Sequence, residues 1–415
     1  MGFDSARAAS GSILLGRGAR APGRKNAPSR FRLGFSLMEV MVAMSILIVM
    51  MLIVVQIIRS TSQIWTSSGN KINAFQGARA AFETMTRNLS QATLQTYYGY
   101  ADLNGNPVPL INPSFLLPNG GAPPVPAYYL RASELHFVSD QAASLFSVAG
   151  VTPPLTTLGD AVFFQAPSGL VNDQSYRFTD SLLNIYGYYV EYVQEVQPQS
   201  IAVSAAGQET SYRYRLMEAV EPAEKNSIYQ STLEVNPATQ LPVYNYDLKW
   251  IQNMGLSGTA SPAHVLADNI IVFAILPKLS ASDEATYGVL SPNYAYDSRS
   301  WETGYTGKSQ KATATTLANP NAAASTLPNA VRNQLPPVVE VVMVAIDETA
   351  ANRLALKYKA TPPFSTGEYS LSGLFTDGTK LQQDLATVET RLQGWGINYR
   401  VFQTEVSLQA ANWSN

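Results

Sequence analysis

One almost wholly apolar run of 24 residues near the N-terminus constrains this chain more than any other feature. It extends from Phe35 to Ile58 (FSLMEVMVAMSILIVMMLIVVQII). A helix rises about 1.5 Å per residue, so the run is long enough to cross a hydrocarbon core about 30 Å thick. It is too long for the apolar part of a secretory signal peptide, and no A-x-A-like cleavage site follows it. The run therefore predicts a transmembrane helix over residues 35–58.

The charges around this run predict its orientation. Residues 1–34 carry one acidic residue, Asp4, and seven basic ones: Arg7, Arg17, Arg20, Arg24, Lys25, Arg30 and Arg32. The whole chain has 28 basic and 30 acidic residues, so 21 and 29 remain outside this basic leader, a net charge of −8. Basic flanks stay in the cytoplasm, which puts the C-terminal part of the chain on the other side of the membrane. An acidic body gives no indication of nucleic-acid binding.

Glu39 does not fit a plain membrane anchor. A carboxylate at the centre of a membrane helix costs about 2.5–3.5 kcal/mol, and even near the interface it favours a positively charged partner. If the chain were cut after Gly34, the new amino terminus at Phe35 would supply a positive charge four residues away. The alternative is a simple signal anchor that carries a stray glutamate.

The segment Arg32–Val40 (RLGFSLMEV) resembles the class III signal of type IV prepilins and type II secretion pseudopilins. That family combines a basic leader, a Gly, a Phe, a Glu at the fifth mature position and an apolar helix. The resemblance implies that a prepilin peptidase removes residues 1–34 by cleaving between Gly34 and Phe35, and then methylates the amino group of Phe35. It also implies that Glu39 pairs with the terminal amine of a neighbouring subunit during filament assembly.

Three further segments resemble J-type minor pseudopilins, namely residues 77–92, 266–273 and 335–341. The overall layout is also similar to that of the "cassette protein C" prepilin-like proteins of Verrucomicrobia. The resemblance implies a pilin-like fold, in which a long N-terminal transmembrane helix packs on an antiparallel β-sheet with large loops.

The helix is expected to continue beyond the membrane as an amphipathic extension over residues 59–96. No proline interrupts residues 35–106, and the extension carries an apolar stripe. The stripe consists of Phe75, Ala78, Phe82, Met85, Leu89 and Ala92. It could pair with a partner in a coiled coil, but we expect it to pack under the sheet of its own domain.

Residues 97–415 are predicted to form a β-rich extracytoplasmic globular domain. Runs rich in Val, Ile, Phe and Tyr predict strands at residues 134–138, 161–165, 185–193, 211–217, 269–276, 338–346 and 397–408. The run 338–346 (VVEVVMVAI) is nearly all apolar and predicts a central strand. Two shorter helices are expected, one over residues 349–356 and one with Leu381, Leu385, Val388 and Leu392 on a single face before Gly394. These elements together predict the α+β fold class.

Residues suited to catalysis or metal binding are scarce. The chain has no cysteine and only two histidines, His136 in a strand-like run and His264 in a predicted loop, and each is expected to be structural or at the surface rather than a ligand. Residues 102–106 resemble the start of a calcium loop, but Pro107 stands where that loop needs a glycine, so an Asx-rich turn is expected. We expect no enzymatic activity, no cofactor and no metal.

The resemblance implies a structural function, that of a minor or tip subunit of a pilus-like filament or a secretion pseudopilus. The implied partners are the prepilin peptidase, other pilin-like subunits and the inner membrane, with the C-terminal domain periplasmic and the protein in a filament after assembly. The large exported domain favours a minor or tip position, because large domains crowd a filament wall. One alternative is an extracytoplasmic adhesin or ligand-binding protein on a pilin stem. The 22 tyrosines could serve carbohydrate binding, although sheet packing is the simpler explanation. A membrane-anchored enzyme would need a catalytic cluster that the sequence does not show.

Overall fold

The computed structural model describes the chain in several stretches. They are residues 36–101, 128–176, 178–179, 181–194, 211–235, 242–244, 248–258, 260–299 and 333–411. The basic leader, the predicted cleavage pair Gly34 and Phe35, and the predicted turn at residues 102–106 lie outside them. The chain divides into two compact units, Met1–Gln63 and Ile64–Asn415.

Helix α1 extends from Leu37 to Ser90 and crosses the boundary between the two units. Its stretch Leu37–Ser62 is long and apolar enough to span a membrane, and none of it is buried. At 1.5 Å per residue its 26 residues extend about 39 Å. The prediction of an apolar helix in this part of the chain is therefore confirmed.

Within the second unit, the apolar stripe of α1 packs as expected into the core of its own domain. Ala78, Phe82, Met85 and Leu89 are buried in the hydrophobic core. The ring of Phe82 lies 5.8 Å from that of Phe402, measured between centroids. This part of the helix therefore belongs to the folded body.

The end of α1 corrects the sequence-based boundary. The helix ends at Ser90 rather than near Thr96. Beyond it, the amide of Thr93 donates a 2.9 Å hydrogen bond to the carbonyl of Gln165. This pairing with a strand replaces the helical hydrogen bond that Thr93 would otherwise make, so tertiary contact sets the boundary.

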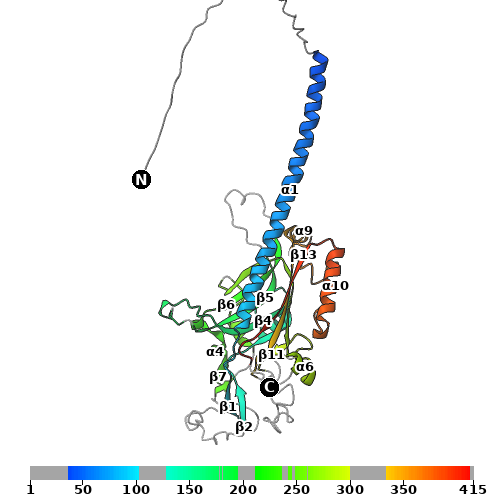
Figure 1. The fold of residues 1–415 in the computed structure, drawn as a ribbon. Helices are drawn as coiled ribbons and strands as arrows, with labels where there is room; N and C mark the ends of the chain where they lie inside the picture. The colour runs from blue at the N-terminus through cyan, green and yellow to red at the C-terminus, as the bar shows by residue number, and fades with distance from the viewer. Residues whose placement is uncertain are drawn as a thin grey trace, which may run out of the picture. The chain divides into compact units, whose positions relative to one another are not determined.

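Two antiparallel sheets form the body (Figure 1). The larger sheet has the strand order β11-β3-β4-β5-β6-β9. Its strands are β3 Val138–Gln141, β4 Thr157–Pro167, β5 Leu183–Gln194, β6 Tyr212–Glu221, β9 Ala263–Asp268 and β11 Tyr296–Asp297. The smaller sheet has the order β10-β12-β13, with β10 Ile270–Lys278, β12 Val338–Ile346 and β13 Tyr399–Ser407. Separate pairs are formed by β1 Tyr97–Ala101 with β2 Tyr128–Ala132 and by β7 Leu233–Val235 with β8 Pro242–Tyr244. With α1, these sheets confirm the α+β class.

Asn269 connects the two sheets. It follows β9 of the large sheet directly and precedes β10 of the small one, in a left-handed conformation with φ 62° that asparagine tolerates. Its backbone amide donates a 2.8 Å hydrogen bond to the backbone carbonyl of Tyr214. Its backbone carbonyl accepts a 3.0 Å hydrogen bond from the backbone amide of Ile346. One residue thus bonds to a strand of each sheet.

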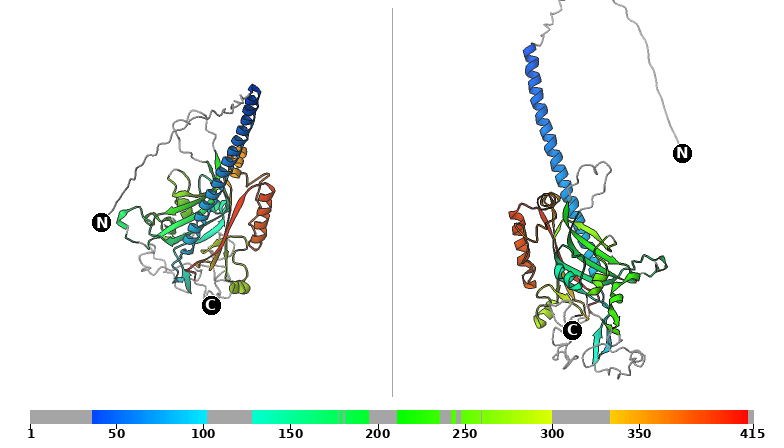
Figure 2. Two further views of the ribbon diagram at one scale, coloured as in Figure 1. Left: turned by 45° about the horizontal axis from the view of Figure 1, so that its top comes forward. Right: turned by 180° about the vertical axis from the view of Figure 1, so that it is seen from behind.

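Shorter helices complete the body. They are α3 Ala142–Ala149, α4 Ser227–Thr232, α5 Lys249–Asn253, α6 Ala281–Tyr287, α9 Glu348–Tyr358 and α10 Leu381–Gly394, with 3-10 turns η1 Gln174–Tyr176, η2 Ala223–Lys225 and η4 Gly378–Lys380. Helix α10 lies beside the small sheet in every view (Figure 1, Figure 2). Its buried residues are the four that periodicity predicted, namely Leu381, Leu385, Val388 and Leu392.

The strand predictions differ in outcome. The run 338–346 is β12, with the predicted bounds and the predicted central place between β10 and β13. The strand predicted over residues 134–138 is wrong, because β3 begins only at Val138. His264 was expected in a loop but lies in β9.

Candidate assembly segment and buried polar clusters

Of the three residues that the resemblance singled out, the described part of the chain contains Glu39. Glu39 is exposed in the first turn of α1. Its amide donates hydrogen bonds to the carbonyl of Ser36 at 3.0 Å and to the Ser36 hydroxyl at 3.2 Å. A serine oxygen that accepts from the amide three residues later is the usual cap of a helix N-terminus.

This cap, made by the Ser36 oxygen and the backbone amide of Glu39, was missed in the sequence analysis. The signal was present as Ser36-Leu37-Met38-Glu39, the S-x-x-E spacing of a capping box. A negative charge in the first turn also interacts favourably with the positive end of the helix dipole. Glu39 therefore has a reason to stand at this position even without a neighbouring subunit.

The apolar side chains that follow Glu39 are exposed without interruption. Leu47 is 65% exposed, Met51 68% and Ile58 61%. Soluble proteins rarely expose a continuous apolar surface of this length, because its contact with water is unfavourable. The segment is therefore a candidate membrane span by its length and composition.

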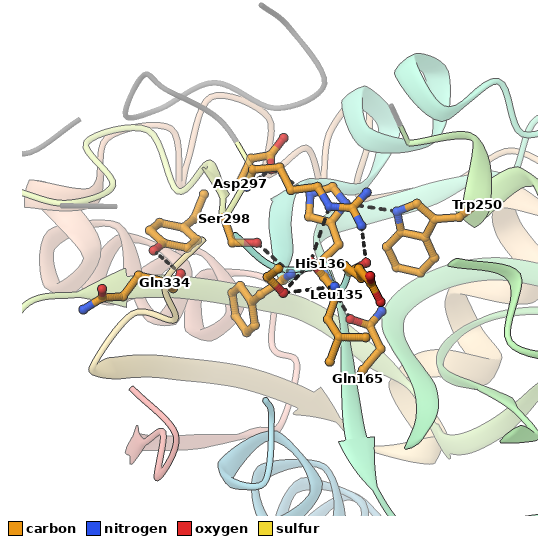
Figure 3. Close-up of polar contacts among 12 residues, drawn as sticks. Leu135, His136, Gln165, Trp250, Asp297, Ser298 and Gln334 are labelled. Atoms are coloured by element: carbon orange, nitrogen blue, oxygen red, sulfur yellow. Dashed lines mark hydrogen bonds and ion pairs between the residues drawn. The ribbon is translucent and has the colours of Figure 1, made fainter. Parts of the chain in front are cut away.

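His136 lies in a buried polar cluster rather than at a surface (Figure 3). The indole Nε1 of Trp250 donates a 3.0 Å hydrogen bond to His136 Nδ1. Because an indole N–H can only donate, Nδ1 must be the unprotonated nitrogen. The Nε2–H therefore donates to Asp297 Oδ1, 2.6 Å away. Both side chains of this pair are fully buried, which suits a structural role better than contact with a substrate.

The same cluster explains why residues 134–137 are not a strand. The amide of His136 donates to Gln165 Oε1 at 2.8 Å, and the amide of Phe137 donates to the hydroxyl of Ser298 at 3.0 Å. The guanidinium of Arg299 donates to the carbonyls of residues 134 and 135. Side chains thus bond to the backbone groups that a neighbouring strand would otherwise pair.

A second buried cluster lies under the end of α1. Asn88 Nδ2 donates to the Tyr188 hydroxyl at 2.9 Å, and that hydroxyl donates to Glu218 Oε1. The other carboxylate oxygen of Glu218 lies 2.9 Å from Nε2 of His264, whose side chain is 56% exposed. Burial and then the charge of Glu218 raise the pKa of Tyr188, so its hydroxyl keeps its proton and can donate.

A third buried acid, Asp160, lies where β4 meets β10. The pairing of β4 with β5 shifts between Leu158 and Ala161, and Gly159 in this bulge has φ 73°. A Cβ on Gly159 would lie 2.4 Å from the carbonyl oxygen of Phe273, so only glycine allows this close approach. Asp160 Oδ2 accepts a 2.8 Å hydrogen bond from the amide of Ile275. Burial raises the pKa of Asp160 well above its ordinary value, against the effect of that hydrogen bond.

Comparison of the chain with protein-family models, with curated proteins and with solved structures gives no match. Among the described residues, no group of three or more His, Asp or Glu side chains is placed to hold a metal ion. A functional assignment therefore depends on the chain's own residues.

Proposed function

We propose that this chain is a prepilin-like structural subunit with a pilin-like form of the α+β fold. It is inserted in the inner membrane, processed by a prepilin peptidase, and built as a minor or tip subunit into a pilus-like filament or secretion pseudopilus. One observation carries the proposal: helix α1 has two parts with different surroundings. Leu37–Ser62 is apolar and exposed, whereas the stripe from Ala78 to Leu89 is buried in the body.

This arrangement favours a filament subunit over a simple signal anchor. An anchor needs an apolar span, but its helix need not form part of the folded domain. In a filament, the exposed apolar stretch has a second use, because it can leave the bilayer and pack against the same stretch of other subunits. Repeated head-to-tail contacts of that kind generate helical assemblies.

The helix cap supports the proposed cleavage site. Cleavage between Gly34 and Phe35 leaves a single residue before the capping Ser36. The new ammonium group then lies beside the N-terminus of α1, which already carries a partial positive charge. Two positive centres side by side repel each other, and the carboxylate of Glu39 is suited to offset them, in its own subunit or in a neighbour.

Processing is tested by intact mass analysis of the protein extracted from membranes, with and without a prepilin peptidase in the host. We expect the mature chain to begin at N-methylated Phe35, and Gly34→Ala to retain residues 1–34. Gly77→Ala is a matched control, since a Cβ there meets no atom within 4 Å, and it should be processed normally. Mature, assembled protein that still begins with Met1 would rule out the proposed cleavage.

Orientation is tested independently of cleavage. A reporter enzyme that is active only outside the cytoplasm, fused after Asn415, should be active, because the basic residues precede the span. A cytoplasmic reporter at the same position should be inactive. The opposite pattern would place the body in the cytoplasm and would exclude the filament proposal.

A further inference from the structure

Strands β1 and β2 form a two-stranded ribbon that extends from the body (Figure 1, Figure 2). Their sequences are YYGYA and YYLRA, so half of the residues in the ribbon are tyrosines. Tyr97, Tyr98 and Tyr129 are 52%, 71% and 54% exposed. The larger sheet uses its tyrosines differently, since Tyr188 and Tyr189 of β5 are fully buried. Packing of the core therefore does not explain the tyrosines of the ribbon.

The pairing register places three of these tyrosines on one face of the ribbon. Tyr98 lies opposite Arg131, and Tyr100 lies opposite Tyr129. Directly opposite residues of an antiparallel pair share a face, and so do residues two positions apart in one strand. We call the face formed by Tyr98, Tyr100, Tyr129 and Arg131 the tyrosine face. The rings of Tyr100 and Tyr129 are neighbours on it, with centroids 4.6 Å apart.

The base of the ribbon is fixed to the body. The hydroxyl of Ser133, directly after β2, donates to the carbonyl of Leu94, and both residues are buried. The side-chain amide of Asn333 donates to the backbone carbonyl of Arg131 at 2.7 Å. The guanidinium of Arg131 donates to the side-chain oxygen of Gln334. The tyrosine face is therefore held in place, and its one charged side chain is bonded within the chain.

Two hydroxyls of the tyrosine face form a donor–acceptor pair. The hydroxyl of Tyr129 donates a 2.9 Å hydrogen bond to that of Tyr100, and this bond raises the pKa of Tyr129. A phenolic hydroxyl both donates and accepts, so Tyr100 keeps a proton to donate and Tyr129 keeps a lone pair to accept. Two adjacent hydroxyls of a sugar ring offer the matching donor and acceptor at a similarly short spacing.

The size of the tyrosine face favours a narrow ligand. Five residues of strand extend about 17 Å, and neighbouring strands lie about 4.8 Å apart, so the face covers roughly 200 Å². A stable protein–protein interface buries about 800 Å² on each partner. Tyrosine combines an apolar ring with a polar tip. That combination suits a chain of sugar rings, whose C–H faces can lie on the aromatic rings while their hydroxyls reach the polar tips.

We propose that the tyrosine face binds neutral saccharides. The rings of Tyr98 and Tyr129 support the sugar rings, and the hydroxyls of Tyr100 and Tyr129 bond to a pair of adjacent sugar hydroxyls. This inference goes beyond the filament proposal and does not depend on it, because the ribbon belongs to the second compact unit alone. The competing explanation is that the ribbon contacts only another protein subunit.

The test uses ligand-observed NMR titration of the full-length protein in micelles of a detergent without a sugar headgroup. The probes are cellotetraose, maltotetraose, chitotetraose and sorbitol, which has hydroxyls but no ring face. We expect saturable binding of at least one tetrasaccharide, with a Kd on the order of 1 mM, and no saturation by sorbitol. If the folded parent is saturated by none of the three tetrasaccharides, the proposal is wrong, and a contact with another subunit becomes the better explanation.

Variants then locate the binding. Tyr98→Ala and Tyr129→Ala should each weaken tetrasaccharide binding at least fivefold, because each removes a ring. Tyr129→Phe keeps the ring and removes the hydroxyl pair, so it should weaken binding about threefold, and it decides the matter if the alanine variants do not fold. Tyr176→Ala is the matched control, since Tyr176 is 48% exposed and lies in η1 outside the ribbon, and it should change the Kd less than twofold. Equal binding by the parent and the folded ribbon variants, or equal binding of sorbitol, would overturn the proposal.

Discussion

Asn88, near the end of helix α1, donates a 2.9 Å hydrogen bond to the hydroxyl of Tyr188 in strand β5. That hydroxyl donates in turn to Glu218 in β6, and Tyr188 itself is fully buried. The helix is therefore joined to two neighbouring strands of the large sheet by a polar chain as well as by its apolar stripe. A buried chain with these partners satisfied favours one placement of the helix on the sheet.

The first prediction is that the body needs the second part of α1. A fragment beginning at Ile64 should fold, whereas one beginning after Ser90 should not. Removing Phe82, Met85 and Leu89 forfeits roughly 5–9 kcal/mol of apolar burial, which is comparable to the whole stability of a typical domain. Circular dichroism and resistance to limited proteolysis distinguish the two fragments. If the shorter fragment melted cooperatively at the same temperature, the helix would be an attachment rather than part of the core.

The second prediction concerns the polar chain. Tyr188→Phe leaves Glu218 and Asn88 without their shared hydroxyl while keeping the ring. Asn88 Nδ2 also donates to Glu218 Oε1 at 3.3 Å, so both groups keep a partner. The loss of the two hydrogen bonds of the hydroxyl should still cost about 1–3 kcal/mol, so the urea midpoint of the Ile64–Asn415 fragment should fall. Tyr176→Phe is the control, since its side chain is 48% exposed and a surface change of this kind stays within about 0.5 kcal/mol. An unchanged midpoint for Tyr188→Phe would show that the chain contributes no stability.

Elements that depend on local periodicity were predicted well from sequence. The four buried residues of α10 recur at helical spacing, and β12 is a continuous apolar run, so each pattern is complete within its own segment. The stripe of α1 was predicted for the same reason. The cap between Ser36 and Glu39 was missed, although its signal is local and its two residues are only three positions apart.

The polar clusters could not be predicted, because their partners are distant in sequence. Trp250 and Asp297 reach His136 from 114 and 161 residues away. Asp160 reaches Ile275 from 115 residues away. No single-sequence pattern encodes which buried acid will bond to which distant amide. The wrong prediction of a strand over residues 134–138 has the same cause, since distant side chains bond to the backbone groups of residues 134–137.

The third prediction concerns Glu191 in β5, whose burial raises its pKa to about 7. The folded state therefore holds the proton more tightly than the unfolded state does. Tighter proton binding by folded Glu191 contributes stability that is fully present below pH 4.5 and is lost as pH rises through about 7. The free energy of unfolding should therefore fall across that window. Glu191→Gln removes this loss. The variant should gain roughly 1–3 kcal/mol on the parent between pH 4.5 and pH 8, allowing for partial solvent screening. A difference that does not change with pH would contradict the raised pKa.

The last prediction separates the two roles of Glu39. Glu39→Gln removes the charge but keeps a side chain that suits the third helical position of a capping box. Glu39→Leu removes both the charge and the capping-box side chain. If Glu39 pairs with the amine of Phe35 in a neighbouring subunit, both variants should be inserted and cleaved normally, yet both should be absent from filaments. Removing one partner of a buried ion pair costs about 3–5 kcal/mol, which weakens subunit association more than a hundredfold.

Incorporation is measured by cross-linking to other pilin-like subunits and by recovery in sheared filaments. Gln56→Leu, another polar residue of the exposed apolar stretch, is the control and should be incorporated. If Glu39→Gln assembles as well as the parent and Glu39→Leu does not, Glu39 acts only as part of the helix cap, and the pairing mechanism is wrong.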